Sequence, residues 1–364
     1  MRISGEAFQV IKRDFNYKAK IYKPYNIRRK HHEGSSMKKI FYICTFIWIT
    51  VCSACSTLSL PLPTHTPQPT KVSEPILITT KMPIVTPNPI LLSDLTGYIG
   101  FYSNFAQGFC LMEAASMTMD STVKCNRIVD KIHGEMDISP DRKKAAFVMG
   151  DRTNGWNIYA VIIGGNEVQQ LTKGLNVNEQ PDWSPDGKRI VFTTGGLIGG
   201  GGISIISADG SNEKDLIPSS VASYLDFFGS PTWSPDGKRI AFSAKLNDRN
   251  EIFTIESDGN GLARVTNGMT LIDNFAPAWS HDGNYISYIT KKEDGTSDIQ
   301  IVSLKNGDVT PLSVGIKGIN HSSWSPDSKY IIFSTRSDML FLVSVNDYNN
   351  IYLIGRGQYP CWVK

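Results

Sequence analysis

The sequence contains few histidines and lacks several short motifs that mark common enzymes. Six of its 364 residues are His. The zinc-peptidase motif HExxH, the hydrolase motif GxSxG and the phosphate-binding loop are all absent. Three of the histidines, His31, His32 and His65, precede the repeated part of the chain. These absences argue against a zinc peptidase of that class, an α/β-hydrolase and a P-loop nucleotidase.

Positive charge is also scarce once the first 39 residues are set aside. Residues 1–39 hold eleven Lys and Arg against Glu6, Asp14 and Glu33. The rest of the chain has 26 basic and 31 acidic residues, a net charge of −5. A surface of this sign does not favour nucleic acid as a partner.

The chain has no apolar run of the length that spans a bilayer comfortably. Its longest candidate, residues 40–54, is uncharged for fifteen residues, whereas a membrane span needs about twenty. Two lysines precede this run and small residues follow it, as in the hydrophobic region of an export signal. The stretch Cys52-Ser53-Ala54-Cys55 resembles a bacterial lipoprotein lipobox, although Cys52 stands where that pattern prefers Leu. The resemblance implies that residues 37–55 are a lipoprotein signal peptide and that Cys55 is the lipidated residue; ordinary cleavage and an uncleaved anchor are the alternatives.

The segments on either side of this signal are predicted to lie outside any folded domain. The codons for Glu33-Gly34 contain the purine run of a ribosome-binding site just before Met37, so residues 1–36 are predicted to be an untranslated or extended leader. Residues 56–95 are rich in Pro and Thr and show no apolar period. Such a composition favours extended conformations without a packed core. We therefore expect a disordered tether that holds a domain of residues 96–364 off a membrane.

A twelve-residue phrase recurs through the rest of the chain. PDWSPDGKRIVF begins at Pro181 and PTWSPDGKRIAF begins at Pro231, and further copies begin at Met136, Pro277 and Ser322. The aligned core positions Ile138, Trp183, Trp233, Trp279 and Trp324 are spaced by 45, 50, 46 and 45 residues. A fixed period of this length is typical of four-stranded propeller blades.

One repeat can be divided into strands and turns from residue chemistry alone. Pro235-Asp236-Gly237 favours a tight turn, and residues 239–243 alternate as a half-buried strand does. A third strand is expected at residues 251–256, a second hairpin turn at 258–261 and a fourth strand at 262–266. No segment carries a sustained helical period. The sequence therefore predicts an all-β fold.

The repeated WSPDGK core resembles the TolB-type propeller repeat, a relative of WD repeats. The resemblance covers about residues 97–364 and implies that the WSPDG strand is the innermost strand of each blade. The chain ends on Tyr359-Pro360-Cys361-Trp362, which looks like the start of one more core, whereas residues 95–102 read as a second strand without a first. We therefore predict a six-bladed β-propeller with four antiparallel strands per blade, closed by the C-terminal strand joining blade 1. Closure of this kind removes an exposed sheet edge.

The residues just before the inner strands vary from repeat to repeat, although the strands themselves are regular. Rigid strand ends around one opening are a common place for recognition, and tolerant loops are the alternative. We expect Glu179, Phe228 and Phe275 to share one opening. The full set of candidate ligand-binding residues is His133, Glu135, Glu179, Asp226, Phe228, Asp273, Phe275, His321 and Gln358.

Two further sets of residues are candidates for covalent or metal chemistry. Cys110 and Cys125 fall on neighbouring antiparallel strands when aligned with another repeat, so we predict a disulfide, with free cysteines as the alternative. The repeated turns each carry one Asp, but a turn of this type needs Asp in any case. We therefore expect no metal, no cofactor and no catalytic residue.

Two classes of function fit these features. The first, which we favour, is a non-enzymatic binding scaffold, a monomer anchored by lipid on the extracytoplasmic or periplasmic side of a bacterial envelope. Its propeller would present a channel mouth to a protein, peptide or glycan. The TolB resemblance implies a protein partner at the envelope, although TolB itself has an additional α/β domain before its blades. The second class is a propeller-based enzyme, such as a polysaccharide lyase or hydrolase acting on an extracellular polymer.

Overall fold

The computed structural model describes residues 76–78 and most of residues 95–364. Within the second range, the residues left undescribed are 105, 107, 117–122, 128–131, 152, 166, 196–200, 219, 220, 222–224, 267–272, 293 and 347–350. The predicted leader, signal peptide and lipidated Cys55 therefore lie outside the described residues. Among the residues that are described, no helix has the length and apolar character needed to cross a membrane.

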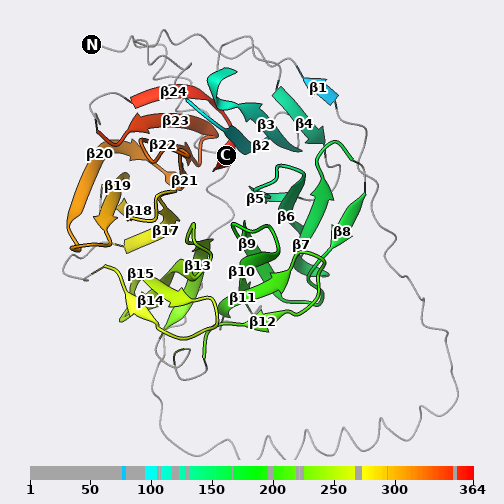
Figure 1. Cartoon of the computed structure of the whole chain (residues 1–364), viewed down its shortest axis with the longest axis horizontal. Helices are drawn as coiled ribbons and strands as arrows, with labels where there is room; N and C mark the ends of the chain where they lie inside the picture. Colours follow the sequence, from blue (N-terminus) through cyan, green and yellow to red (C-terminus); the bar gives the residue numbers. More distant parts are fainter. Residues whose placement is uncertain are drawn as a thin grey trace, which may run out of the picture. The chain divides into compact units, whose positions relative to one another are not determined.

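The domain is an all-β propeller, with its sheets arranged around a common centre (Figure 1). Each repeat of the sequence forms one set of strands that runs outward from the centre. The first sheet contains β1 (Ile76–Ile78), β2 (Tyr98–Ser103), β3 (Gly108–Glu113), β4 (Val123–Arg127) and β25 (Gln358–Val363). The second contains β5 (Ile132–Ile138), β6 (Lys144–Asp151), β7 (Gly155–Ile162), β8 (Val168–Gln170), β9 (Val177–Trp183), β10 (Arg189–Gly195), β11 (Gly201–Ser207) and β12 (Lys214–Asp215).

The three remaining sheets each have four strands in the order of the sequence. The third contains β13 (Asp226–Trp233), β14 (Arg239–Leu246), β15 (Arg249–Glu256) and β16 (Ala263–Arg264). The fourth contains β17 (Asp273–Trp279), β18 (Tyr285–Lys291), β19 (Thr296–Ser303) and β20 (Val309–Lys317). The fifth contains β21 (Ile319–Trp324), β22 (Tyr330–Thr335), β23 (Met339–Ser344) and β24 (Ile351–Arg356).

The C-terminal strand joins the two ends of the domain. Strand β25 pairs antiparallel with β2, and Trp362 stands opposite Ile99. The Trp362 indole nitrogen donates a hydrogen bond of 2.8 Å to the carbonyl oxygen of Thr96. The predicted pairing between the last strand and the first is therefore present.

Each inner turn is held by the Asp of the repeated phrase. The Ser234 hydroxyl donates to Asp236 Oδ1 at 2.6 Å, and the Lys238 amide donates to the same oxygen at 3.1 Å. Gly237 takes a φ of +68°, a conformation that glycine adopts without steric cost. The same Ser–Asp contact occurs at Asp141, Asp186, Asp282 and Asp327. These aspartates therefore serve the turns.

The hydrophobic core lies between the strand sets rather than within them. One cluster combines Val191 of β10 and Ile203 of β11 with Phe242 of β14 and Phe253 of β15, all of them buried. Each set therefore buries its faces against its neighbours, because a single sheet cannot cover both of its own apolar faces.

The outer edge of the first sheet differs from expectation at three residues. Strand β1 lies within the segment predicted to be a tether, yet it pairs antiparallel with β4, with Ile76 opposite Cys125. The segment predicted to be a tether therefore contains a short strand at residues 76–78. Ile76-Leu77-Ile78 is a short aliphatic run of the kind that favours strands, and the free edge of β4 offers it hydrogen-bonding partners.

Candidate functional site

Four of the inner strands, β9, β13, β17 and β25, share a bulge three residues before the tryptophan of the repeat. Gln180, Ser230, Ala276 and Tyr359 all have positive φ, between 47° and 58°. The register of the strand ladder shifts at the same four places. A proline follows each of these residues, and proline within a sheet is confined to edges and bulges because it cannot donate to the ladder. Bulges of this kind change the direction of the strand and re-aim side chains.

Polar side chains from several inner strands gather beside these bulges, and we call Glu135, Glu179, Gln180, His321 and Tyr359 the mouth cluster. All five are partly buried. The Gln180 amide donates to Glu135 Oε2 at 3.1 Å. The Gln180 side chain also links to the next inner strand, since its Oε1 accepts from the Ser230 amide at 2.6 Å and its Nε2 donates to the Ser230 hydroxyl at 3.2 Å. The rings of His321 and Tyr359 meet edge to face, with their centroids 6.0 Å apart.

The electrostatics of the mouth cluster favour neutral side chains. Burial, and then the nearby Glu179 carboxylate, raises the pKa of Glu135 to about 8, against the lowering effect of the Gln180 hydrogen bonds. Burial also raises the pKa of Glu179. Burial lowers the pKa of His321 to about 4. For Tyr359, burial and then the two glutamates raise the pKa well above its usual value. The side chains of Glu135, His321 and Tyr359 are therefore uncharged at neutral pH.

A second layer of polar groups lies next along the same strands. Asp137 Oδ2 accepts a hydrogen bond of 2.7 Å from the amide of Trp183, and Asp182 Oδ2 accepts one of 2.8 Å from the amide of Trp233. Each aspartate therefore binds the following inner strand. Burial raises the pKa of Asp137 to about 6, and burial together with Asp137 raises that of Asp182 well above its usual value. The buried thiol of Cys361 also faces Asp137.

The structure places the other residues predicted for the mouth in different surroundings. Phe228 packs into the apolar cluster of the third sheet, with its ring centroid 5.9 Å from that of Phe242. Phe275 packs likewise against the cluster that contains Ile289 and Trp324. Both phenylalanines are partly buried, and their grouping with Glu179 at one opening stays a prediction.

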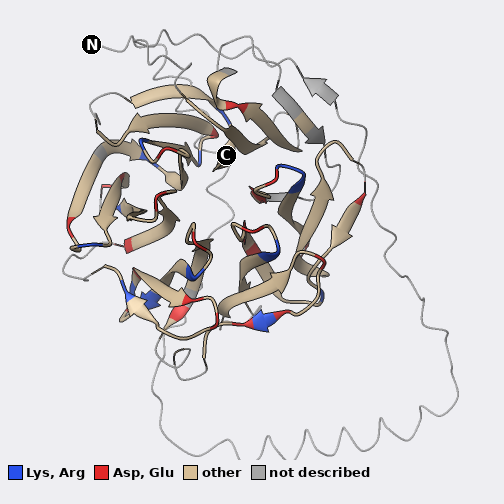
Figure 2. Cartoon of the chain, in the orientation of Figure 1, with Lys and Arg blue, Asp and Glu red and all other residues tan. Residues whose placement is uncertain are grey.

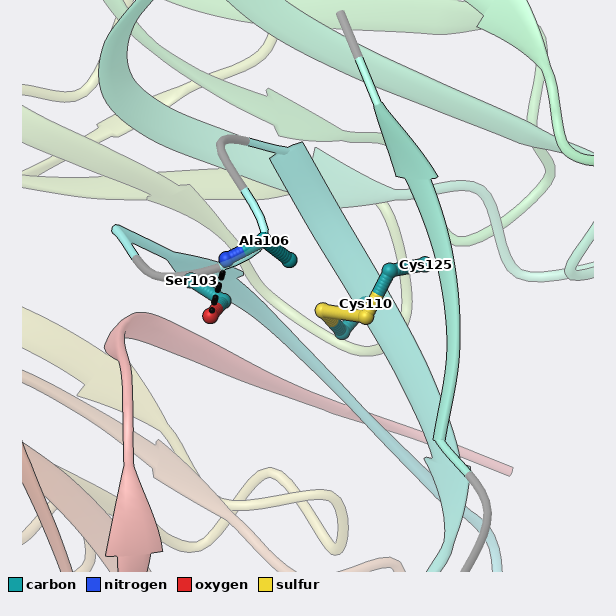
Figure 3. Close-up of a disulfide and its surroundings, with 4 residues drawn as sticks. All are labelled: Ser103, Ala106, Cys110 and Cys125. Atoms are coloured by element: carbon teal, nitrogen blue, oxygen red, sulfur yellow. Dashed lines mark hydrogen bonds between the residues drawn. A yellow bond between two sulfur atoms is a disulfide. The ribbon is translucent and has the colours of Figure 1, made fainter. Parts of the chain in front are cut away.

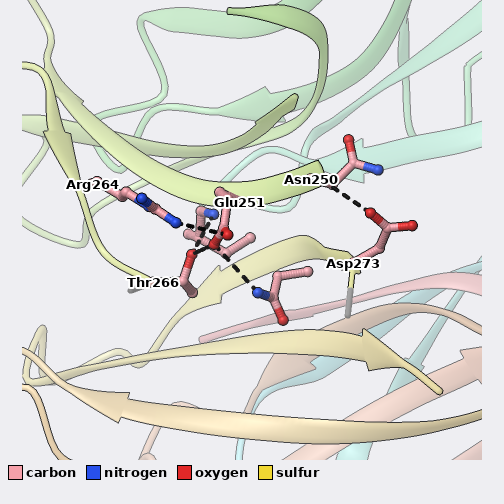
Figure 4. Close-up of polar contacts among 7 residues, drawn as sticks. Asn250, Glu251, Arg264, Thr266 and Asp273 are labelled. Carbon is pink, nitrogen blue, oxygen red and sulfur yellow. Dashed lines mark hydrogen bonds and ion pairs between the residues drawn. The ribbon is translucent and has the colours of Figure 1, made fainter. Parts of the chain in front are cut away.

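The remaining candidates show no common arrangement. Asp226 is exposed. Asp273 is partly buried, and its Oδ1 accepts a hydrogen bond of 3.0 Å from the Asn250 amide (Figure 4). Gln358 is partly buried opposite Tyr102. His133 lies on β5, but its side chain is outside the described part of the chain.

A buried polar cluster in the third sheet was missed in the sequence analysis. The Glu251 carboxylate forms an ion pair with Arg264, with 2.8 Å between Oε1 and the guanidinium nitrogen, and accepts a hydrogen bond from the Thr266 hydroxyl (Figure 4). The side-chain nitrogen of Asn274 lies 3.4 Å from Glu251 Oε2. The Glu251 side chain is only 2% exposed. The cluster joins β15 to the neighbouring inner strand β17, so its contacts serve the packing between sheets.

The predicted disulfide is present in the first sheet. Cys110 and Cys125 stand opposite each other on β3 and β4 and are bonded through their sulfur atoms (Figure 3). The bridge fixes the outer part of this sheet, next to the strand β1.

Charged residues of both signs are interspersed around the inner turns in the view of Figure 2. Within the described ranges, no group of three or more His, Cys, Asp or Glu side chains is arranged to hold a metal ion.

Comparisons with known proteins agree with this fold. The family model described as the TolB beta propeller domain matches residues 217–354. No curated protein matches the chain at a significant level. Among solved structures, TolB from Acinetobacter baumannii is similar with a TM-score of 0.60 and 20% identity over 74% of this chain and 67% of that one.

Two further solved structures show the same likeness in fold. The putative TolB from Agrobacterium tumefaciens has a TM-score of 0.52 and 22% identity over 64% of this chain and 83% of that chain. An oligogalacturonate lyase in complex with manganese has a TM-score of 0.54 and 12% identity over 79% of this chain and 86% of that chain. The repeated turns, the closure by β25 and these matches lead to one conclusion: the chain carries a TolB-like β-propeller domain.

Proposed function

We propose that the protein is a non-enzymatic binding scaffold, anchored in a bacterial envelope, whose propeller presents its channel mouth to a protein, peptide or glycan. The observation that carries the proposal is the mouth cluster. Glu135 and Glu179 come from the first half of the domain sequence and Tyr359 from its end, yet both glutamates act on Tyr359 and raise its pKa. Strand packing alone does not require polar groups at the positions of Glu135 and Tyr359, since Ala276 occupies the equivalent position of β17.

In this proposal the propeller has six blades of four antiparallel strands each. The sheet that contains β5–β12 counts as two blades, with β5 and β9 as their inner strands. Strand β25 serves as the inner strand of blade 1, while β2, β3 and β4 are the strands outside it. Six inner strands then surround one channel, and the mouth cluster belongs to four of them: β5, β9, β21 and β25.

The proposal places the domain outside the cytoplasm as a monomer, held by a lipid on Cys55, with no cofactor and no nucleic acid as a partner. Replacing Cys55→Ser in the producing bacterium should release the protein from the membrane fraction and abolish labelling with a radioactive fatty acid. Continued membrane association without acyl label would instead indicate an uncleaved anchor at residues 40–54.

The mouth itself is tested by capture from envelope extract with the full chain as bait. The variant Glu179→Gln keeps the size of the side chain and removes its ability to ionise. We expect it to lose a partner that the unaltered protein retains under cross-linking, with an unchanged melting temperature or a higher one. The matched control is Asp258→Asn, an exposed carboxylate in an outer hairpin turn.

Equal capture by all three proteins would overturn the role of the mouth cluster. Cleavage of an extracellular polysaccharide by the purified protein, measured as new reducing or unsaturated ends, would support the enzyme in place of the scaffold.

A further inference from the structure

Four carboxyl groups lie on the inner strands β5 and β9, whose contact we call the seam, and they interact in two pairs: Glu135 with Glu179, and Asp137 with Asp182. Glu135 and Asp137 lie on β5, and Glu179 and Asp182 lie on β9. All four are partly buried. The seams farther round the ring are different, since Thr232, Ala278 and Ser323 occupy the positions equivalent to Asp137 and Asp182.

Three of these carboxyl groups bind inner strands together. Glu135 accepts from the Gln180 amide and Asp137 accepts from the Trp183 amide, so both reach from β5 to β9. Asp182 continues the series by accepting from the Trp233 amide of β13. These hydrogen bonds make the seam sensitive to any change in the carboxyl groups.

No basic side chain forms an ion pair with any of the four among the residues that the structure describes. The ionisable groups that act on these carboxyls are Tyr359 and Cys361 of β25, and His321 of β21 lies against Tyr359. Arg189 stacks on Trp233. Arg336 influences Tyr359.

We propose that the contact between β5 and β9 depends on protonation. The two strands stay in contact while Glu135, Asp137, Glu179 and Asp182 carry protons, and they separate as these groups ionise. Like charges in one poorly solvated seam repel each other, and each loses hydration that no cation replaces. Separation of β5 from β9 admits water and relieves both costs. Such local opening below the threshold of global unfolding is a general property of folded domains.

The shifts in acidity support this assignment. Burial raises the pKa of Glu135 to about 8 and that of Asp137 to about 6, and the pKa values of Glu179 and Asp182 are raised as well. In an unfolded chain these groups would ionise near pH 4. The folded seam therefore binds more protons than the unfolded chain between about pH 4 and pH 8, and linkage requires its stability to fall as the pH rises through that window.

Hydrogen exchange of the full chain tests the proposal at the level of single strands. Protection factors, which correct for the intrinsic effect of pH, are compared between a peptide covering β9 and one covering β18 at pH 5 and pH 9. We expect the protection of β9 to fall by roughly tenfold or more relative to β18, since one pKa unit corresponds to a tenfold change in an equilibrium. An equal change in both peptides would overturn the proposal.

A variant and a titration complete the test. In Glu135→Gln/Asp137→Asn/Asp182→Asn, where carboxamides replace three carboxyls, the extra loss of protection in β9 should disappear. If this variant does not fold, proton exchange measured on unfolding the unaltered protein at pH 7.5, where the histidines of an unfolded chain bind few protons, decides the matter. Net release of protons on unfolding supports the proposal, because the folded state would then hold protons that the unfolded chain does not. The absence of any release contradicts it.

Discussion

Arg189 lies over the indole ring of Trp233, with its guanidinium carbon 4.6 Å from the ring centroid. The two residues belong to consecutive repeats: Arg189 begins β10, and Trp233 ends the next inner strand. Arg239 makes the same contact with Trp279 at 4.8 Å, and in the following repeat Tyr285 stacks on Trp324 at 6.4 Å between ring centroids. The repeated phrase therefore contains both halves of a contact that fixes each repeat against its neighbour.

Replacing Arg189→Ala should reduce the free energy of unfolding by about 1 kcal/mol, the usual size of a cation–π contact that is partly shielded from water. Chemical denaturation of the full chain measures this loss. Lys188→Ala, an exposed neighbour in the same turn, is the control and should change the free energy little. Equal effects of the two substitutions would show that the stacking adds no stability.

The turns and inner strands were predictable because their chemistry is local. Pro235, Asp236 and Gly237 specify a turn without reference to any other part of the chain, and the Asp236 contacts confirm this prediction. The pairing of β25 with β2 followed from the incomplete repeats at the two ends. Both predictions needed only the pattern of residues and general rules for turns and sheet edges.

The mouth could be predicted only in part, because bulges change which way a side chain points. A ladder shift alters the two-residue alternation that assigns side chains to faces. Phe228 lies within the shift between Asp226 and Gly229, and Phe275 lies directly beside another. Their alternation therefore could not show that they pack into the core. The prolines after Gln180, Ser230, Ala276 and Tyr359 were the available signal for these bulges.

Deleting residues 359–364 should destabilise the domain severely. The deletion removes most of β25 together with Trp362, which is only 3% exposed, and the loss of a buried Trp side chain alone costs about 3–5 kcal/mol. A total stability of roughly 5–15 kcal/mol leaves little after such a loss. Thermal unfolding measures the effect, and deletion of the exposed Lys364 alone is the control. If both deletions leave the melting temperature unchanged, pairing by β25 does not stabilise the domain.

The disulfide between Cys110 and Cys125 should stabilise the first sheet. Its cysteines are separated by 15 residues, and closing a loop of this length corresponds to about 3 kcal/mol in the chain-entropy description. Cys110→Ser/Cys125→Ser should therefore lower the melting temperature, and a reducing agent should do the same to the unaltered protein. The reducing agent should have no further effect on the double variant; an equal fall in both would place its action elsewhere.

The turn aspartates should give a pH dependence of the opposite sign to the β5–β9 seam. The Ser234 hydroxyl, more than any other group, lowers the pKa of Asp236. A lowered pKa in the folded state contributes stability above the unfolded value of about 3.9, and this contribution is lost as the pH falls through the folded value. Asp236→Asn should therefore melt below the unaltered protein at pH 7, and the difference should shrink below about pH 4. A difference that stays constant from pH 7 to pH 2 would contradict the role of the ionised carboxylate.

Variants of the ion pair between Glu251 and Arg264 can separate two contributions to the free energy of unfolding: the loss caused by an unpaired buried charge, and the stabilisation that the ion pair itself provides. Glu251 is 2% exposed, whereas the Arg264 side chain is 36% exposed (Figure 4). Arg264→Ala leaves the carboxylate with only Thr266 and Asn274 as partners, and breaking a buried pair in this way costs about 3 kcal/mol or more. Because Arg264 is partly in water, the measured loss should lie near the lower end of that range.

Adding Glu251→Gln to Arg264→Ala should restore part of the lost stability, because the second substitution removes the uncompensated charge. Lys245→Ala is the matched control, since it breaks an ion pair with Asp248, which is 97% exposed. Exposed pairs of this kind contribute about 0–1 kcal/mol. Denaturant unfolding of the unaltered protein and the three variants should therefore rank Arg264→Ala as the least stable. A double variant less stable than Arg264→Ala would show that the Glu251 carboxylate is held by Thr266 and Asn274 and does not depend on the arginine.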